Sequence, residues 1–424
     1  MLARPTEYAP FPGTWLGVLG LASVVGVIVG SSRSVEILAA LTMFLCGWTV
    51  AAIMHRATQY AVALNVLLAV VLPSVVTNEL SFRLVFILLA ANVGLLLAAG
   101  IRGPVQRADV GLVVLLAAVL WPYFISGGLD TLPGALGIVV IMYLTGRSRG
   151  VSLQSLVALL LIAGAVQGAV ALAQSVPSLS SLVPFQAMRD GVPFITGRAN
   201  GLYNNPNTLG TVEAVILVVA TRVDLRRWMI PLVVFCAAGL LLSSSREAIF
   251  GLIVGLSLLG RGRFRQMVSW VIGFLIVGAI VVWAFPSLLE RLDPSGYATD
   301  PNLLGRFDVW RVALDFIGRS PLYGYGMEIL IFLPQALPFV DNAYFVLLLA
   351  GGMAGLALWI VGIVVVTPRL LWPALGAMLA IATLANPFSG PTYAVFLATC
   401  GAVAAEDARR RPRVPAAGPS RVVS

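Results

Sequence analysis

The chain has 424 residues, of which 59% are hydrophobic and 11% are charged, and its formal net charge is +9. Soluble domains carry about 25% charged residues, so this composition excludes an ordinary water-soluble protein. Apolar runs recur from Trp15 to Ala404, and each is near the ~20 residues that cross a bilayer as a helix. No run alternates polar and apolar residues as a barrel strand does. We therefore predict an all-α polytopic membrane protein.

The apolar runs predict about 14 transmembrane helices, within a range of about 12–14. Their approximate bounds are 14–30, 35–54, 60–77, 82–100, 109–126, 132–146, 152–175, 207–222, 229–243, 246–260, 267–285, 342–365, 370–386 and 391–404. We expect residues 1–404 to form one transmembrane bundle. Residues 405–424 lack an apolar run of this length and should form a basic, disordered tail.

The arginines predict how the bundle is oriented. All 27 basic residues are arginine, and they gather in alternate connections, as the positive-inside rule describes for cytoplasmic loops. Examples are Arg102, Arg147, Arg226, Arg263 and Arg369. Both termini should then face the cytoplasm.

Two connections on the predicted external face are long, near 176–206 and 286–341. Loops of this length in a compact protein are usually functional or disordered. Against the positive-inside tendency, they and the adjoining span mouth hold seven arginines: Arg189, Arg198, Arg246, Arg291, Arg306, Arg311 and Arg319. We infer that the external face has a use for cations.

The first external loop ends in "NNPNT", residues 204–208. Asn-Pro is a turn signal, and Asn207 has the residue type of a helix N-cap. Asn205 and Asn207 are either capping residues or ligand contacts, and Arg198 precedes them. Glu213 lies two turns inside the next span, where an ionisable group is costly and tends to face a partner or a wet cavity.

The stretch "SSSREAIF", residues 243–250, places Arg246 and Glu247 at the external end of a span. Arg246 can be an interfacial residue that reaches water, and Glu247 a first-turn acid favoured by the helix dipole. Three serines before an arginine also make a donor-rich corner that suits phosphate oxygens.

The second external loop contains "GRFDVWRVALDFIGRSPLYGYG", which predicts an amphipathic helix on the membrane surface. Its predicted apolar face consists of Phe307, Trp310, Leu314 and Ile317. Its polar stripe has the spacing of an ion-pair ladder and consists of Asp308, Arg311, Asp315 and Arg319. Arg306 precedes the ladder and is available to a ligand. Pro321, Gly324 and Gly326 should end the helix.

The next span begins in "FVDNAYFVLLLAGGMAG", residues 339–355. Asp341 can be the N-cap of this span, or it can accept a proton during catalysis. Gly351 and Gly355 form a small-xxx-small face for tight helix packing.

The external side of a membrane offers no nucleotide sugars, so a glycosyltransferase acting there must take its sugar donor from the membrane. A polyprenyl-diphosphate-linked sugar fits, because arginines can neutralise the diphosphate leaving group and a carboxylate can deprotonate the acceptor. The external loops contain no acidic metal-binding motif, and Cys46, Cys236 and Cys400 lie far apart. The single histidine, His55, falls in a cytoplasmic connection. We expect no metal, cofactor or nucleic acid.

These motifs resemble the O-antigen ligase and O-antigen polymerase superfamily of bacterial envelope glycosyltransferases. The resemblance covers roughly 160–365 and rests on the order of Asn-Pro-Asn, "SSSRE", "GRFDVW" with "SPLYGYG", and a closing motif. The family's closing pattern is His, then Asn, Ser or Gln, nine residues, and Gly-x-x-Gly. Here Asp341 and Asn342 precede nine residues and then Gly352 and Gly355. The spacing matches, and Asp341 stands in the place of the histidine.

The resemblance implies a metal-independent, inverting transfer of a glycan from undecaprenyl diphosphate to a hydroxyl of a glycan or lipid-linked acceptor. It places the active site on the external face of the bacterial inner membrane, among membrane lipids. It implies that Arg246 and Arg306 grip the diphosphate and that Asp341 is the base, with Glu213 or Glu247 as alternatives if Asp341 is a cap. The further candidate substrate contacts are Arg198, Asn205, Asn207, Glu213, Glu247, Arg311, Asn342 and Tyr344. The missing histidine favours a polymerase, or a ligase with another acceptor.

Two other functions use similar residues. A flippase of lipid-linked sugars also needs arginines and a polar cavity, but it should show an inverted repeat and charges through the full membrane depth. A peptidoglycan glycosyltransferase of the shape and division family would place a catalytic aspartate in a large external loop. Asp293, Asp300 and Asp308 are available for that role.

Overall fold

The computed structural model describes residues 62, 65–66, 105–126, 132–148, 151–176, 188–189, 192–193, 198–203, 205–259, 264–286, 301–327, 329, 342–386 and 391–410. Within these ranges the regular structure is helical apart from a small hairpin, in which β1 (Met188–Arg189) pairs antiparallel with β2 (Val192–Pro193). The predicted all-helical class is confirmed for this part of the chain.

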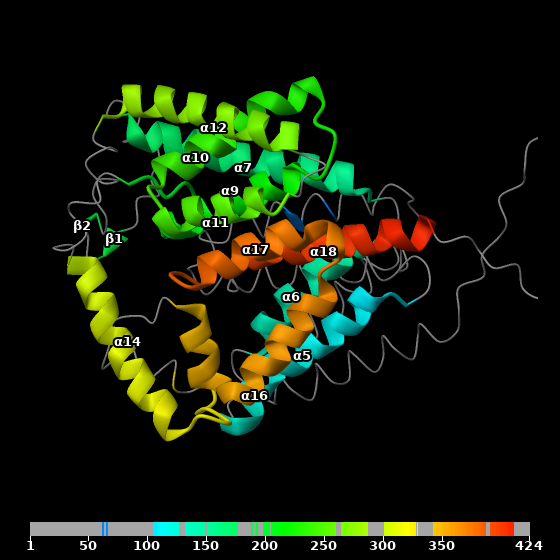
Figure 1. The fold of residues 1–424 in the computed structure, drawn as a ribbon, viewed down its shortest axis with the longest axis vertical. Coiled ribbons are helices and arrows are strands. Elements are labelled where there is room, and N and C mark those ends of the chain that lie inside the picture. Colours follow the sequence, from blue (N-terminus) through cyan, green and yellow to red (C-terminus); the bar gives the residue numbers. More distant parts are fainter. Residues whose placement is uncertain are drawn as a thin grey trace, which may run out of the picture.

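The helices follow the predicted apolar runs (Figure 1). They are α5 (Arg107–Ser126), α6 (Leu132–Arg147), α7 (Leu153–Ser175), α9 (Pro206–Ala220), α10 (Ile230–Leu242), α11 (Arg246–Ser257), α12 (Phe264–Ala284), α14 (Pro301–Arg319), α16 (Ala343–Val366), α17 (Trp372–Ala382) and α18 (Pro391–Arg410). Short 3-10 helices, η4 (Arg227–Met229) and η7 (Arg369–Leu371), precede α10 and α17. The four spans predicted before residue 105 lie outside the described residues, except for Val62, Asn65 and Val66.

Three of the described helices are long and apolar enough to cross a membrane: α5, α7 and α16. Shorter apolar helices cover Pro206–Ala220, Arg227–Leu242, Val268–Ala284 and Arg369–Ala382. Because these are shorter than the ~20 residues of a full span, the predicted count of about 14 spans is not confirmed.

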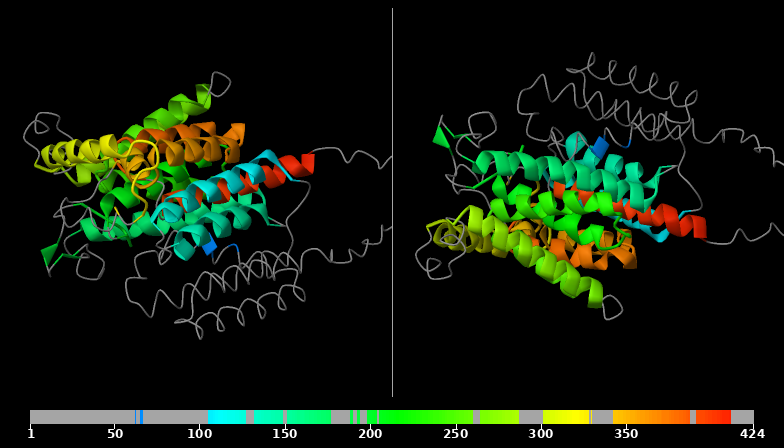
Figure 2. Two further views of the ribbon diagram at one scale, coloured as in Figure 1. Left: turned by 90° about the horizontal axis from the view of Figure 1, so that it is seen from below. Right: turned by 90° about the horizontal axis from the view of Figure 1, so that it is seen from above.

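Two helices form the centre of the described bundle. Helix α9 is buried along nearly its whole length, and α18 is buried from Pro391 to Ala405. A helix that is apolar on every side is covered either by neighbouring helices or by lipid, and here neighbouring helices cover both α9 and α18. Figure 1 shows α7, α10, α11, α12 and α17 running roughly along α9 and α18, while α5, α6 and α16 are inclined to them and α14 is inclined the opposite way. Figure 2 shows that these helices are stacked in layers.

Glycines let neighbouring helices approach closely. The contacts at these glycines also show in which direction each neighbouring helix runs. A Cβ at Gly210 of α9 would lie 2.5 Å from Ser245 Cβ, and one at Gly255 of α11 would lie 2.7 Å from Val218 Cγ2. Helices α9 and α11 therefore run parallel. Gly251 of α11 faces Ile381 and Gly255 faces Pro373, so α17 runs antiparallel to both. The starts of α9 and α11 thus meet the end of α17.

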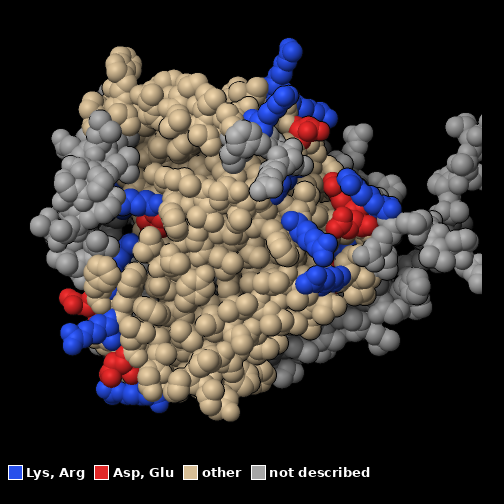
Figure 3. Space-filling model, viewed as in Figure 1, with Lys and Arg blue, Asp and Glu red and all other residues tan. Residues whose placement is uncertain are grey.

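The opposite end of these helices carries many of the described arginines, including Arg222, Arg226, Arg369 and Arg409. In Figure 3 charged side chains gather at two opposite sides of the molecule, with an uncharged zone between them. This distribution matches two polar ends separated by an apolar band.

Arg147, which the sequence places in a cytoplasmic connection, is the last residue of α6 and is buried. Its side chain is 1% exposed, and it donates to Asp109 of α5 through Nε (3.0 Å) and Nη2 (2.9 Å). The Tyr143 hydroxyl donates to the same carboxylate at 2.7 Å. This ion pair joins α5 to the end of α6, which explains why the buried Arg147 guanidinium is tolerated there.

Candidate functional site

The candidate site lies where several helix ends meet, at the end of the bundle opposite the arginine-rich one. The starts of α9 and α11 and the end of α17 converge there, and Thr211 of α9 contacts Thr392 at the start of α18 at 2.9 Å between hydroxyl oxygens. In Figure 1 the start of α14 lies on the same side as the end of α17. Helix N-termini present free N–H groups and a positive dipole end, so this geometry favours an anionic ligand.

Arg198, in the first predicted external loop, forms hydrogen bonds with residues at this end of the bundle. Its Nε donates to the Ser243 carbonyl at 2.8 Å, and its Nη2 donates to the Asn207 side-chain oxygen at 2.5 Å. The N-cap of α9 is Asn205, whose side chain accepts from the Asn207 amide at 2.8 Å, with Pro206 next to it. The prediction that Asn207 is the cap is therefore wrong. Pro206 is suited to the first helical position, so the helix starts one residue after Asn205 and leaves the Asn207 side chain for Arg198.

Two glutamines that the sequence analysis missed dock the same loop on α7. Gln167 accepts from the Leu202 amide at 2.7 Å, while Gln174 accepts from the amides of Asn200 (3.1 Å) and Gly201 (2.9 Å). They lie seven residues apart in an otherwise apolar helix and hence on one face. That spacing is the signal that could have identified them.

The serine turn between α10 and α11, residues 243–245, holds buried polar groups without partners. Ser244 has φ 50°, a left-handed conformation that is unusual for a residue other than glycine. Within the described part of the chain, the hydroxyls of Ser244 and Ser245 are buried and have no hydrogen-bond partner. Ser245 is also the N-cap of α11 but makes no side-chain cap hydrogen bond. Because buried polar groups are normally satisfied, this turn has donors available for a ligand.

Arg246 and Glu247 follow this turn as the first two residues of α11. Arg246 is partly exposed, whereas Glu247 is 5% exposed. Within the described residues, Oε1 of Glu247 has no hydrogen-bond partner. The structure therefore places a cation and a buried carboxyl group directly beside the serine turn.

The end of α17 receives three of the predicted site residues from other helices. Arg306 of α14 donates to the Leu384 carbonyl at 3.4 Å, and Asn342 donates to the Thr383 carbonyl at 2.8 Å. The Tyr344 hydroxyl donates to the Leu379 carbonyl at 3.0 Å. Carbonyls at a helix C-terminus lack intrahelical donors, so these side chains satisfy them. Arg306, Asn342 and Tyr344 are thereby held at the same end as Arg246.

The N-cap of α16 is Asn342 and not Asp341. The Asn342 side-chain oxygen accepts from the amides of Tyr344 (2.9 Å) and Phe345 (3.2 Å). The capping interpretation of Asp341 is therefore wrong, because the following residue fills that position. Asp341 itself lies outside the described residues.

Helix α16 is broken at Gly352, which has φ 62° and ψ −165°. The sequence predicts one continuous span here. The amides of Tyr325 and Gly326 donate to the carbonyls of Leu349 and Ala350, each at 2.8 Å. In return, the Met353 amide donates to the Pro321 carbonyl at 2.8 Å. A break inside an apolar helix is tolerated because the "SPLYGYG" segment satisfies the freed backbone groups.

The other glycines of this motif have the packing role that the sequence predicts. A Cβ would lie 3.3 Å from Trp121 Cδ1 of α5 at Gly351, and 3.1 Å from it at Gly355. Trp121 Nε1 also donates to the Gly351 carbonyl at 3.0 Å. The "SPLYGYG" segment and the glycines of the closing motif are thus parts of one junction, which joins the end of α14 to the middle of α16.

Helix α14 confirms the predicted amphipathic helix, and Trp310 and Ile317 of its predicted apolar face pack against α16. The other two predicted positions do not. Val309 (4% exposed) and Ala313 (0%) are its buried positions, while Phe307 (52%) and Leu314 (53%) are exposed. The helix packs on the first half of α16, where Trp310 stacks edge-on against Phe345, and this contact selects the face. Of the predicted ladder, the structure shows the exposed Asp315–Arg319 ion pair (2.6 Å). Arg311 is exposed and has no ion pair with a described residue.

Glu213 lies away from the other candidates, buried two turns below the start of α9. A Cβ at Gly164 of α7 would lie 2.7 Å from its Oε2, and one at Gly239 of α10 would lie 3.5 Å from its Oε1. The carboxyl group is 0% exposed and sits between these helices, near Cys236. Glu213 therefore faces a packed helix crossing. Of the two predicted surroundings, a partner or a wet cavity, the described residues do not form the wet cavity.

The comparison with protein families identifies the central part of the chain. Residues 231–360 match the family model described as O-antigen ligase. This stretch is similar to the O-antigen ligase family. The predicted resemblance is confirmed over this stretch, which is narrower than the expected 160–365. No curated protein matches the chain, and no solved structure matches it.

The O-antigen ligase segment runs from α10 into α16 and contains the serine turn, Arg246, Glu247, Arg306 and Asn342. Arg198 and Asn207 precede it in sequence, but their hydrogen bonds place them against Ser243 inside it. The segment therefore supplies most of the candidate site, and α9 and α17 complete it.

Proposed function

We propose that this protein transfers or polymerises a glycan from a polyprenyl diphosphate onto an acceptor hydroxyl, at the external face of the bacterial inner membrane. The match of residues 231–360 to the O-antigen ligase family model supports this general activity. The observation that carries the proposal is the meeting of Arg198, Arg246 and the serine turn with Arg306 and Asn342 around the end of α17.

The proposed diphosphate site combines arginines with free backbone and hydroxyl donors. Arg246 and Arg306 neutralise the charge that develops on the diphosphate as it leaves the sugar. The unsatisfied hydroxyls of Ser244 and Ser245 and the first-turn amides of α11 donate to its oxygens. Arg198 holds the serine turn and the start of α9 together.

In the proposed step, the Asp341 carboxylate accepts the proton of the acceptor hydroxyl. The acceptor oxygen attacks the anomeric carbon as the bond from that carbon to the diphosphate oxygen breaks, with inversion. Polyprenyl diphosphate leaves with the bonding electrons. The assignment is supported by Asn342, which caps α16 and so leaves its neighbour free of that role. Family resemblance places Asp341 at the position of the base, and no metal takes part in the proposed step.

The arginine-rich end of the helices supports the orientation. Cytoplasmic loops are enriched in arginine, so the end that carries Arg226 and Arg369 should face the cytoplasm. The candidate site, at the other end, then opens to the side on which the lipid-linked donor is presented.

The test is a transfer assay with full-length protein in detergent, a polyprenyl-diphosphate oligosaccharide as donor, and either a second lipid-linked glycan or a lipid A core as acceptor. Released polyprenyl diphosphate and an elongated acceptor are expected. Arg246→Ala and Arg306→Ala should each lower the rate by about 100-fold or more, the scale of a lost transition-state contact. Arg319→Ala, on the same helix as Arg306 but exposed, should leave the rate within about twofold.

Donor that crosses a liposome membrane unchanged, without release of diphosphate, would identify a transporter and overturn the proposal. Equal rates for Arg306→Ala and Arg319→Ala would remove Arg306 from the site. The acceptor that becomes elongated distinguishes a polymerase from a ligase.

A further inference from the structure

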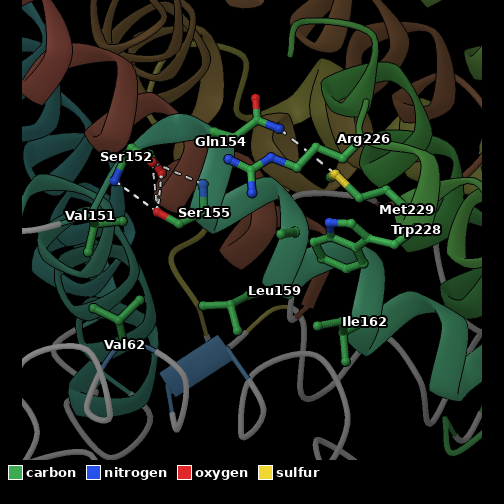
Figure 4. Close-up of a pocket in the computed structure, with 11 residues that line it drawn as sticks. Val62, Val151, Ser152, Gln154, Ser155, Leu159, Ile162, Arg226, Trp228 and Met229 are labelled. Atoms are coloured by element: carbon green, nitrogen blue, oxygen red, sulfur yellow. Dashed lines mark hydrogen bonds between the residues drawn. The ribbon is translucent and has the colours of Figure 1, made fainter. Parts of the chain in front are cut away.

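A pocket of about 460 Å³ lies at the arginine-rich end, far from the candidate site along the helices (Figure 4). Its polar lining comes from the start of α7 and from the region of η4. The start of α7 contributes Ser152, Gln154 and Ser155, and the region of η4 contributes Arg226, Trp228 and Met229. The remaining lining residues are apolar: Val62, Val151, Ala158, Leu159 and Ile162.

The upper part of this pocket is polar and carries a cation. Arg226 is exposed and has no ion pair within the described residues. In Figure 4 its side chain extends toward the Ser152–Ser155 turn. These two serines form the capping box of α7, with 2.8 Å between their hydroxyl oxygens. The neighbouring charges, Asp224 and Arg227, are exposed and do not line the pocket.

The lower part is apolar and continues along α7. Leu159 and Ile162 line the pocket, and Val166 follows Ile162 one turn later on the same face. Ile162 is 44% exposed and Val166 is 41% exposed. Arg226 therefore lies at one end of a partly exposed apolar stripe on α7.

Trp228 lies beside Arg226 and is 51% exposed. Tryptophan is enriched at the level of lipid headgroups, where its ring contacts the apolar region and its N–H contacts water. An arginine, an interfacial tryptophan and an apolar stripe, in this order, match the phosphate, glycerol and acyl regions of a phospholipid. Basic pockets on the cytoplasmic side of helical bundles recognise anionic headgroups.

We propose that this pocket binds an anionic phospholipid from the cytoplasmic leaflet. Arg226 pairs with the lipid phosphate, Trp228 contacts the glycerol region, and one acyl chain lies along Leu159, Ile162 and Val166. This site is separate from the proposed diphosphate site. Its leaflet rests on the orientation proposed above, whereas the lipid contacts themselves do not depend on the proposed function.

Native mass spectrometry of the full-length protein in detergent tests this proposal. The probes are phosphatidylglycerol, phosphatidylcholine with the same acyl chains, and inorganic phosphate. Phosphatidylglycerol should bind more tightly than phosphatidylcholine, and Arg226→Gln should weaken its binding about fivefold, the usual effect of one basic residue near a membrane surface. Arg369→Gln is the matched control, because Arg369 is exposed at the same end but does not line the pocket. It should leave binding unchanged.

Ile162→Gln tests the acyl contact and should weaken the binding of both lipids. The unfolding midpoint of each variant shows that the fold is kept. Equal binding of the two lipids to the unaltered protein would overturn the proposal, as would equal weakening by Arg226→Gln and Arg369→Gln. Displacement of phosphatidylglycerol by inorganic phosphate alone would show a phosphate-ion site in place of a lipid site.

Discussion

Asn342 donates a hydrogen bond from its side-chain amide to the carbonyl of Thr383, 2.8 Å away, while its side-chain oxygen caps α16. One side chain thus starts a helix and joins it to the end of α17. The donor and the acceptor of this amide have separate roles, and substitutions can separate them.

Asn342→Asp keeps a capping oxygen but removes the donor to Thr383, whereas Asn342→Ala removes both. We expect Asn342→Ala to lower the free energy of unfolding by about 1–3 kcal/mol, the sum of a lost cap and a lost hydrogen bond. Asn342→Asp should be less destabilised but should also transfer glycan more slowly. Denaturant unfolding in detergent and the transfer assay measure the two effects. An unchanged unfolding curve for Asn342→Ala would contradict this cap.

Asp341→Asn should abolish transfer, with a loss of about 100-fold or more that is typical of a missing general base. Its unfolding midpoint should equal that of the unaltered protein, because the cap of α16 is Asn342. Parallel assays of rate and thermal unfolding test both statements. A variant with near-normal transfer would remove Asp341 from the mechanism.

Gly352→Ala should destabilise the junction between α14 and α16. The backbone conformation at Gly352 is one that only glycine adopts readily, and a Cβ there would lie 2.3 Å from the Leu322 carbonyl oxygen. We expect Gly352→Ala to lower the free energy of unfolding by about 2 kcal/mol or more. Gly318→Ala is the control within α14, because a Cβ there meets nothing within 4 Å, and it should stabilise by about 0.5–1 kcal/mol. Equal stability of the two variants would argue against the break in α16.

Asp109→Asn should lower the free energy of unfolding by about 3–5 kcal/mol, because it removes the carboxylate charge to which the buried Arg147 guanidinium donates two hydrogen bonds. Combining it with Arg147→Gln should cost less than the sum of the two single changes, since the pair is coupled. A double-mutant cycle on the free energy of unfolding measures this coupling. Additive effects would show that the pair contributes nothing beyond its separate contacts.

Glu213→Gln should keep transfer within about threefold, because a residue packed far from the reacting groups affects catalysis little. The side chain is enclosed between α7 and α10, two turns below the site. Glu247→Gln is the comparison. Because Glu247 lies beside the serine turn, this substitution should lower the transfer rate more than Glu213→Gln does. A loss of about 100-fold in Glu213→Gln with normal unfolding would make Glu213 the base.

The helices after residue 105 were predictable from the sequence because long apolar runs have few other stable forms in a membrane. The amphipathic character of 305–319 and the turn at Gly324 and Gly326 were also readable, since periodicity and glycine act locally. The inward face of α14 was not, because Phe307 and Leu314 fit an apolar stripe as well as Val309 and Ala313 do. Only the contact with α16 separates these alternatives.

Capping was ambiguous for a similar reason. Asn205 and Asn207, or Asp341 and Asn342, have nearly equal intrinsic preference for an N-cap. The choice depends on which side chain is needed elsewhere: Asn207 is engaged by Arg198, and Asn342 reaches Thr383 while it caps.

The sequence by itself determined that this is a helical membrane protein with arginines and polar turns at the predicted external helix ends, because composition and spacing act along the chain. It also contained the family motifs in order. The tertiary structure decided that these motifs meet around the end of α17 and that "SPLYGYG" closes a break at Gly352. Those arrangements depend on hydrogen bonds between residues far apart in sequence and on glycines that admit a neighbouring backbone, and no local pattern specifies such partners.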